Sequence, residues 1–101
     1  MLCARHSAEH PSGPVLIVEV ADSSLVFDRR YKGSLCARAQ VTDYWIVNLR
    51  RRTLEVYREP VPTPSARFGW SYASVRRLTA TATIAPLAAP HATIAVADLL
   101  P

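Results

Sequence analysis

Two hydrophobic patterns lie in the first half of the chain. Residues 15–21 are apolar except for Glu19, and such a run is typical of a strand buried on both faces, with neighbouring strands on both sides. Residues 25–39 carry apolar side chains at helical spacing. Either of the two serines that precede them, Ser23 or Ser24, can act as the N-cap. A buried strand followed by a helix is therefore predicted.

The rest of the chain shows shorter, strand-like patterns. Aromatic and β-branched residues fill 43–49, and apolar and polar residues alternate over 53–58 and 70–78. The arginines after the first of these strands form a turn, and the three prolines within 59–66 predict a loop. Residues 94–100 predict a short edge strand and a closing turn. Together these elements predict an α/β fold with a mixed sheet and one crossover helix.

Length and composition place limits on the class of protein. The 101 residues fit one domain over residues 14–101, preceded by a poorly ordered lead-in over residues 1–13. No apolar run approaches the ~20 residues that span a bilayer, and no secretory signal is visible. We expect a cytoplasmic protein without a membrane partner. Cys3 and Cys36 have no metal-ligand spacing and are expected to be free thiols.

The charge favours a polyanionic partner. The net charge is +4, and it comes from eleven arginines and a single lysine, Lys32. Arginine and lysine neutralise phosphates and release counterions, so the charge fits contact with a nucleic acid. Compositional drift can also enrich a surface in arginine. The run at residues 50–52 fits either a solvated turn or a phosphate clamp.

Three residues suggest a site for metal-dependent phosphodiester hydrolysis. Glu19 is an ionisable group in an apolar strand, where a carboxylate is costly unless it is paired or bound to a metal. Asp28 and Lys32 lie four residues apart on the predicted helix. Carboxylate oxygens suit Mg²⁺, and an ammonium group can assist the attacking water. The simpler alternatives are a carboxylate paired with arginine for Glu19, and an ordinary i,i+4 helix pair for Asp28 and Lys32.

The order of several motifs resembles the bacterial Uma-type restriction endonuclease family, which belongs to the PD-(D/E)XK nuclease superfamily. The resemblance runs from about residue 14 to residue 101. The motifs, in chain order, are Val-Leu-Ile-Val-Glu-Val, Ala-Asp-Ser-Ser-Leu, Phe-Asp-Arg-Arg-Tyr-Lys, Ala-Arg-Ala, Asp-Tyr-Trp-Ile-Val-Asn-Leu, Leu-Glu-Val-Tyr-Arg and Ile-Ala-Val-Ala-Asp-Leu-Leu.

The resemblance implies a partial restriction-endonuclease-like core that cleaves DNA with Mg²⁺ or Mn²⁺, without a small-molecule cofactor, and often as a homodimer. By resemblance Glu19 is a metal ligand, and Asp28 is a second acid and ligand. The superfamily's lysine normally lies two residues after the strand acid, where this chain has Ala21. In this family it moves onto the following helix, at Lys32.

Two departures from the family pattern affect the expected activity. Family members carry an aspartate at a Pro-Asp start of the first strand, where this chain has Gly13, Pro14 and Val15. Family chains also extend further upstream. The resemblance therefore implies a truncated copy with reduced or no nuclease activity. The alternative is a non-catalytic α/β module that binds DNA or a protein partner.

Overall fold

The computed structural model describes residues 16–101. The lead-in expected over residues 1–13, with Cys3, lies outside this range. The described elements are β1 (Leu16–Ala21), the π-helix η1 (Phe27–Lys32), α2 (Gly33–Arg38), β2 (Asp43–Asn48), β3 (Thr53–Pro62), β4 (Trp70–Leu78), β5 (Thr83–Ile84), β6 (Ile94–Ala95) and the 3₁₀-helix η2 (Val96–Leu99).

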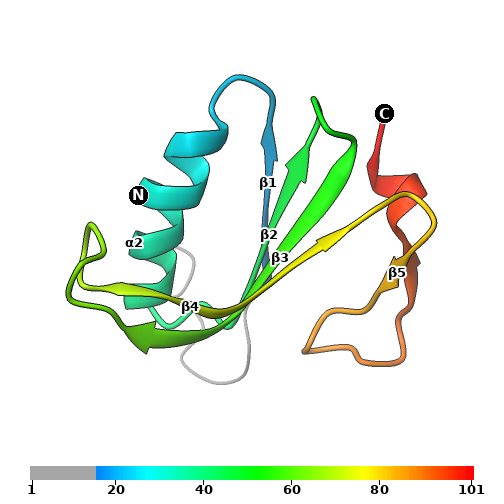
Figure 1. Cartoon of the computed structure of the whole chain (residues 1–101). Coiled ribbons are helices and arrows are strands. Elements are labelled where there is room, and N and C mark those ends of the chain that lie inside the picture. The colour runs from blue at the N-terminus through cyan, green and yellow to red at the C-terminus, as the bar shows by residue number, and fades with distance from the viewer. Residues whose placement is uncertain (1–15) are drawn as a thin grey trace.

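The main sheet has four strands in the order β1-β2-β3-β4 (Figure 1). β1 runs parallel to β2, whereas β2–β3 and β3–β4 are antiparallel. A parallel pair needs a crossover connection, and η1 with α2 supplies it. The predicted α/β class, with a mixed sheet and one crossover helix, is confirmed.

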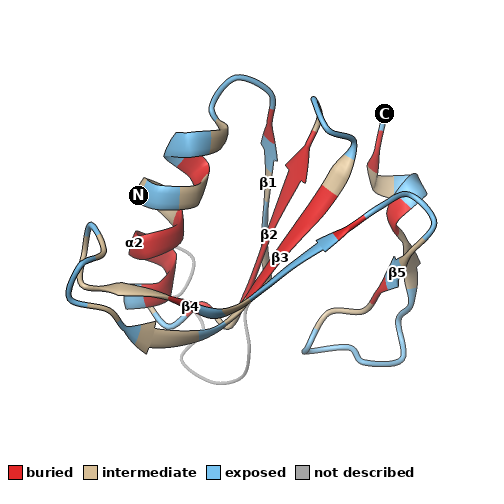
Figure 2. Ribbon diagram, in the orientation of Figure 1, coloured by how far each residue is buried: buried red, intermediate tan, exposed pale blue. Residues whose placement is uncertain are grey.

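The sheet is covered on both faces, so the molecule has three layers (Figures 1 and 2). The helix packs on one face through the cluster Ala21, Cys36, Ala37, Val41, Tyr44, Ile46, Tyr57 and Tyr72. The C-terminal arm, made of β5, β6 and η2, packs on the other through Trp45, Val47, Leu54, Val56, Leu78, Ile84, Val96 and Leu100. The side chains of β2 alternate between these two cores.

A buried carboxylate ties the C-terminal arm to the sheet. Asp43, at the start of β2, accepts hydrogen bonds from Trp45 Nε1 at 2.6 Å, Arg58 Nε at 2.9 Å and the Leu87 amide at 2.9 Å. Arg58 also donates to the main-chain oxygen of Ala85 at 2.7 Å. The arm is therefore held by hydrogen bonds as well as by apolar packing.

The expectation that β1 is buried on both faces is wrong for its outer face. Val18 is 44% exposed and Val20 is 62% exposed. Within residues 16–101, β1 pairs with β2 alone, and the apolar clusters of the C-terminal arm include neither valine. The apolar run therefore predicted the strand correctly but predicted the burial of its outer face incorrectly.

β3 continues through the segment that the prolines predicted to be a loop. β2 begins at Asp43, which pairs with Arg58, so beyond this point β3 has only β4 as a neighbour among the described strands. Pro60 and Pro62 pair with Tyr72 and Trp70. Proline is tolerated on an edge strand because its missing N–H leaves no ladder bond unmade there.

The helix forms where it was predicted, but its first part is wound as a π-helix. The amide of Gly33 donates to the main-chain oxygen of Asp28, five residues earlier. The same oxygen accepts a hydrogen bond from the Tyr44 hydroxyl at 2.9 Å. A π-turn inserts an extra residue into the turn and often occurs at functional sites.

Two further expectations are tested by the described part of the chain. Cys36 is fully buried in α2 and is disulfide-bonded, so the expectation of a free thiol is wrong for this residue. Among residues 16–101, no helix is both long enough and apolar enough to cross a bilayer.

Gly33→Ala should stabilise the fold by about 0.5–1 kcal/mol, because alanine loses less backbone entropy than glycine in a helix. Gly33 has helical angles, and a Cβ here would lie 3.5 Å from the Asp28 oxygen, an ordinary contact. Gly69→Ala is the matched control and should destabilise, because Gly69 has φ = 75°. Urea unfolding measures both; a destabilised Gly33→Ala would show that the π-turn requires glycine.

Candidate functional site

The three predicted site residues converge between β1 and η1. Glu19 lies on the same face of β1 as Ile17 and Ala21, which pack against the helix. Lys32 Nζ donates to Glu19 Oε1 at 3.2 Å and lies 3.3 Å from Asp28 Oδ1. We call Glu19, Asp28 and Lys32 the acid–lysine cluster. The structure therefore brings together all three residues that the sequence singled out.

Asp28 is the most constrained member of the cluster. Its residue is 2% exposed, and its Oδ2 accepts a hydrogen bond from Ser24 Oγ at 2.9 Å. Ser24, one of the two serines expected as the N-cap, lies directly before the helix and its carbonyl accepts from the Asp28 amide at 2.9 Å, while its hydroxyl holds this carboxylate. Asp28 Oδ1 is buried and accepts no hydrogen bond from the described part of the chain. This oxygen is therefore held only by its charge contact with Lys32.

The environment of Lys32 favours its charged form. Burial disfavours the ammonium ion, but the hydrogen bond to Glu19 and the charges of Glu19 and Asp28 outweigh this cost and raise the pKa of Lys32 above its usual value. The Nζ atom also lies 5.7 Å from the centre of the Phe27 ring, within the range of a cation–π contact. Lys32 is thus a protonated group at neutral pH, with two carboxylates and one aromatic ring around it.

The sequence missed a second ion pair, on the other side of η1. Arg29 donates from Nε to Glu55 Oε1 at 2.9 Å, and its Nη2 bonds the other carboxylate oxygen. Glu55 has no exposed surface, although it occupies a polar position in the alternating pattern of residues 53–58. It also accepts hydrogen bonds from Tyr57 at 2.7 Å and from Asn48 at 3.4 Å. The only sequence signal was that Glu55 alternates with the apolar residues of β3.

These contacts set the ionisation of Glu55. Burial would raise the pKa of the Glu55 carboxyl, but the hydrogen bonds from Arg29 and Tyr57 dominate and lower it below 4.5. Burial raises the pKa of Tyr57, and the Glu55 carboxylate beside it does so further. Glu55 is therefore a buried carboxylate that stays ionised and paired.

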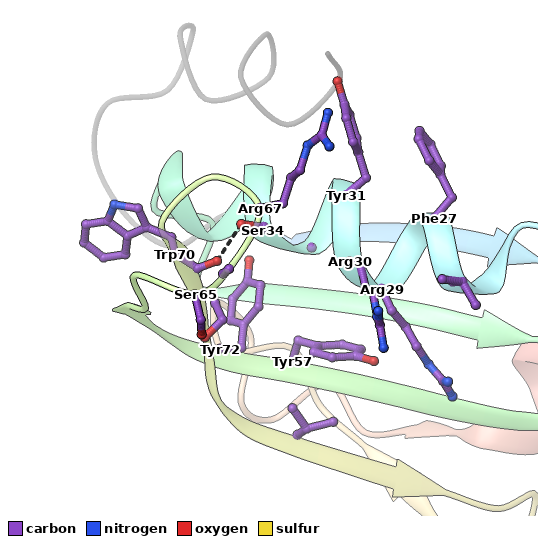
Figure 3. Close-up of a pocket in the computed structure, with 15 residues that line it drawn as sticks. Phe27, Arg29, Arg30, Tyr31, Ser34, Tyr57, Ser65, Arg67, Trp70 and Tyr72 are labelled. Carbon is purple, nitrogen blue, oxygen red and sulfur yellow. Dashed lines mark hydrogen bonds between the residues drawn. The ribbon is translucent and has the colours of Figure 1, made fainter.

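An open cleft of about 670 Å³ separates η1 from the β3–β4 loop (Figure 3). Tyr57 and Tyr72 lie on its sheet side. Ser34 ties the loop to the helix, because its Oγ donates to the main-chain oxygen of Trp70 at 2.6 Å and accepts from the Phe68 amide at 2.9 Å. The cleft borders η1, but no member of the acid–lysine cluster lines it.

The arginines of the β2–β3 turn have different surroundings. Arg50 forms an exposed pair with Asp22 at 3.2 Å, and Arg52 donates to the main-chain oxygen of Pro101 at 2.7 Å. Arg51 borders a cleft of about 420 Å³ together with Arg77. The phosphate clamp suggested for this turn stays a prediction.

The donor set of the acid–lysine cluster is compatible with a hard divalent cation. Two carboxylates reach the same ammonium group, so their oxygens face one small volume, and Mg²⁺ prefers oxygen ligands. The buried Asp28 Oδ1, which accepts no hydrogen bond from residues 16–101 and lies 3.3 Å from Lys32 Nζ, faces this volume. Within residues 16–101, no group of three or more acidic, histidine or cysteine side chains gathers around one point. Two protein ligands are therefore the most that the described cluster supplies.

Arg29→Met should lower the free energy of unfolding by about 2–4 kcal/mol, because it leaves the Glu55 carboxylate buried without its cation. Arg30→Met is the matched control: Arg30 is the exposed neighbour and has no ion pair among the described residues, so its change should stay within about 0.5 kcal/mol. Urea unfolding of both variants checks this. Similar losses would show that the Arg29–Glu55 pair contributes no more than a surface arginine.

The lowered pKa of Glu55 predicts a loss of stability in acid. Unfolding raises this pKa toward 4.5, so the stabilisation is complete above that value and is lost as the pH falls through the lower, folded-state pKa. We expect the free energy of unfolding of the wild type to fall more steeply between about pH 5 and pH 3 than that of Glu55→Gln. Parallel pH profiles would contradict this assignment.

Comparison with known proteins gives one match. The family model described as Uma2, putative restriction endonuclease, matches residues 3–97, which is most of the chain. No curated protein and no solved structure matches this sequence. The match includes β1, η1 and β2, the elements that build and flank the acid–lysine cluster. The chain belongs to the Uma2 family of putative restriction endonucleases.

Proposed function

We propose that this chain is a metal-dependent DNA endonuclease of low activity, with the acid–lysine cluster as its reaction centre. Membership of the family implies a nuclease-like function, DNA as the substrate and the use of a divalent metal. The observation that carries the finer proposal is the convergence of Glu19, Asp28 and Lys32 from two separate elements.

Each residue of the cluster has a role in this proposal. Glu19 and Asp28 would hold Mg²⁺ or Mn²⁺, and the ion would supply a polarised phosphoryl oxygen and a more acidic bound water. Lys32, kept protonated by its two neighbours, would stabilise the negative charge that develops on the phosphate. Ser24 and the π-turn fix the position of Asp28, so this carboxylate needs no rearrangement to act as a ligand.

Low activity follows from the same geometry. Mg²⁺ keeps most of its water molecules when the protein offers only one or two carboxylates, and binding is then weak. Lys32 already neutralises both carboxylates, so a divalent ion must compete with it. The family's strand-start aspartate has no counterpart at Gly13, Pro14 or Val15, which removes one further expected ligand.

A homodimer is the arrangement that would add ligands. Among the described strands, β1 has a partner on one side only, and its outer face exposes Val18 and Val20. An unpaired strand edge with exposed apolar side chains favours association with another chain. Pairing of two copies along β1 would place two acid–lysine clusters near each other.

The second candidate function is DNA or partner binding without catalysis. It is favoured by the same ion pairs, because a lysine that satisfies two carboxylates also makes a stable structural cluster without any metal. In that case the cluster fixes the helix on the sheet, and the arginines of the surface provide the function.

Mn²⁺ should raise the melting temperature of the wild type but not that of Glu19→Gln, because only the wild type keeps both ligands. At ten times its dissociation constant the ion would contribute about 1.4 kcal/mol, or several degrees for a domain of this size. Glu59→Gln, which removes an exposed carboxylate from β3, should behave like the wild type. Equal shifts in all three proteins would exclude Glu19 from a metal site.

Nicking of supercoiled plasmid in Mg²⁺ or Mn²⁺ then separates the two candidate functions. We expect slow nicking by the wild type that falls about 100-fold or more in Lys32→Ala, the loss that follows removal of one charge-stabilising donor. Nicking that rises faster than protein concentration would indicate a dimer. No nicking by folded wild type, or nicking unchanged in Lys32→Ala, would favour the binding module.

A further inference from the structure

We propose that a surface of aromatic rings and arginines beside the acid–lysine cluster binds the unpaired bases of single-stranded DNA. The aromatic–arginine surface consists of Phe27 and Tyr31 from η1, Phe68 from the β3–β4 loop, Arg38 from α2 and Arg67 from the same loop. This inference deepens the proposed function, since it takes DNA as the substrate and specifies which form of DNA the site prefers.

The three rings form a continuous row. Phe27 and Tyr31 lie one helical turn apart and stack, with centroids 4.8 Å apart and planes inclined by 14°. Tyr31 meets the edge of Phe68 at 5.1 Å, across the gap between helix and loop. Stacked and edge-on pairs at these distances are favourable, so the row is a preformed aromatic surface.

The arginines of this surface have no acidic partner in the described part of the chain. Arg67 lies 5.3 Å from the centre of the Tyr31 ring and 5.6 Å from that of Phe68, and Arg38 lies 5.0 Å from the Phe68 ring. The ion pairs of residues 16–101 involve other cations. A guanidinium that rests on a ring face keeps its N–H groups available for phosphate oxygens.

A purely structural role accounts for the loop contacts but not for Phe27. Ser34 already joins the loop to the helix through two hydrogen bonds. Phe27 stacks on Tyr31 at the end of the row away from the loop and is 47% exposed. Figure 3 shows Phe27 and Tyr31 projecting from the helix, with Arg67 beside Tyr31. Phe27 contacts Tyr31 and lies 5.7 Å from Lys32 Nζ, yet about half of the residue remains exposed, so part of its ring is accessible to a ligand.

The position of Phe27 connects this surface to the proposed reaction centre. Lys32 Nζ lies 5.7 Å from the Phe27 ring centre, so a base stacked on that ring would have its own phosphate near the acid–lysine cluster. Bases within a duplex are stacked on each other and offer no free face, whereas unpaired bases stack readily on aromatic side chains. The combination of rings and unpaired arginines therefore favours a single strand over a duplex.

Fluorescence anisotropy in EDTA tests this binding without cleavage. The probes are a fluorescein-labelled single strand of mixed sequence, its blunt duplex, and a strand of equal length with abasic sites throughout. We expect the single strand to bind several-fold more tightly than either other probe at the same salt concentration. Phe27→Ala and Tyr31→Ala should each weaken its binding about tenfold, the range for loss of one base–ring stack, and leave duplex binding within about twofold.

Matched variants separate stacking from charge and from folding. Tyr31→Phe keeps the ring and should bind like the wild type. Arg67→Gln should weaken single-strand binding more than Arg76→Gln, which removes an equal charge from an exposed position on β4. Leu87→Ala removes an exposed apolar side chain from another part of the molecule and should have no effect. Far-ultraviolet circular dichroism confirms that each variant is folded.

Three results would overturn the inference: duplex or abasic DNA binding as tightly as the single strand, ring variants without effect, or equal losses in the Arg67 and Arg76 variants. A protein that nicks plasmid but fails these tests would keep the proposed nuclease function and lose only the single-strand preference. A protein that passes them but never cleaves would be a single-strand binder without a working reaction centre.

Discussion

The ammonium group of Lys32 is the constraint on which the helix-to-sheet arrangement depends. Glu19 on β1 and Asp28 on η1 both face the space between strand and helix, where two unpaired carboxylates would repel each other and lose their hydration. One protonated side chain that forms an ion pair with each carboxylate offsets that cost. On the other side of the same helix, Arg29 does the same for Glu55 on β3. Two ion pairs therefore hold η1 on the sheet. One joins it to β1 through Glu19, and the other joins it to β3 through Glu55.

The sequence was most informative where one local pattern decided the structure. The apolar run with a single acid gave β1, and the spacing of Asp28 and Lys32 placed both on one side of the helix, so the acid–lysine cluster could be predicted. The bounds of β4 were predicted to the residue. In each case the decisive interactions were between neighbours in the chain, or between a strand and the crossover that follows it.

The features that the sequence did not predict have a different cause, because each depends on a partner far along the chain. At the π-turn, the Asp28 carbonyl also accepts a hydrogen bond from the hydroxyl of Tyr44, which lies on β2. Glu55 is buried because Arg29, 26 residues earlier, covers it. β3 extends through its prolines because β4 pairs with that part of the strand after β2 has ended. None of these partners is visible in the local alternation of polar and apolar residues.

Stability and chemistry make opposite demands on the acid–lysine cluster. As a structural element it is most favourable when Lys32 bonds both carboxylates, which is the arrangement observed. As a metal site it requires those oxygens to be free. The Phe27 ring lies within cation–π range of the ammonium group, so Lys32 has a second favourable contact if one carboxylate is engaged elsewhere. In the proposed reaction, Lys32 would neutralise both carboxylates at rest and turn toward a phosphate when a metal ion engages them.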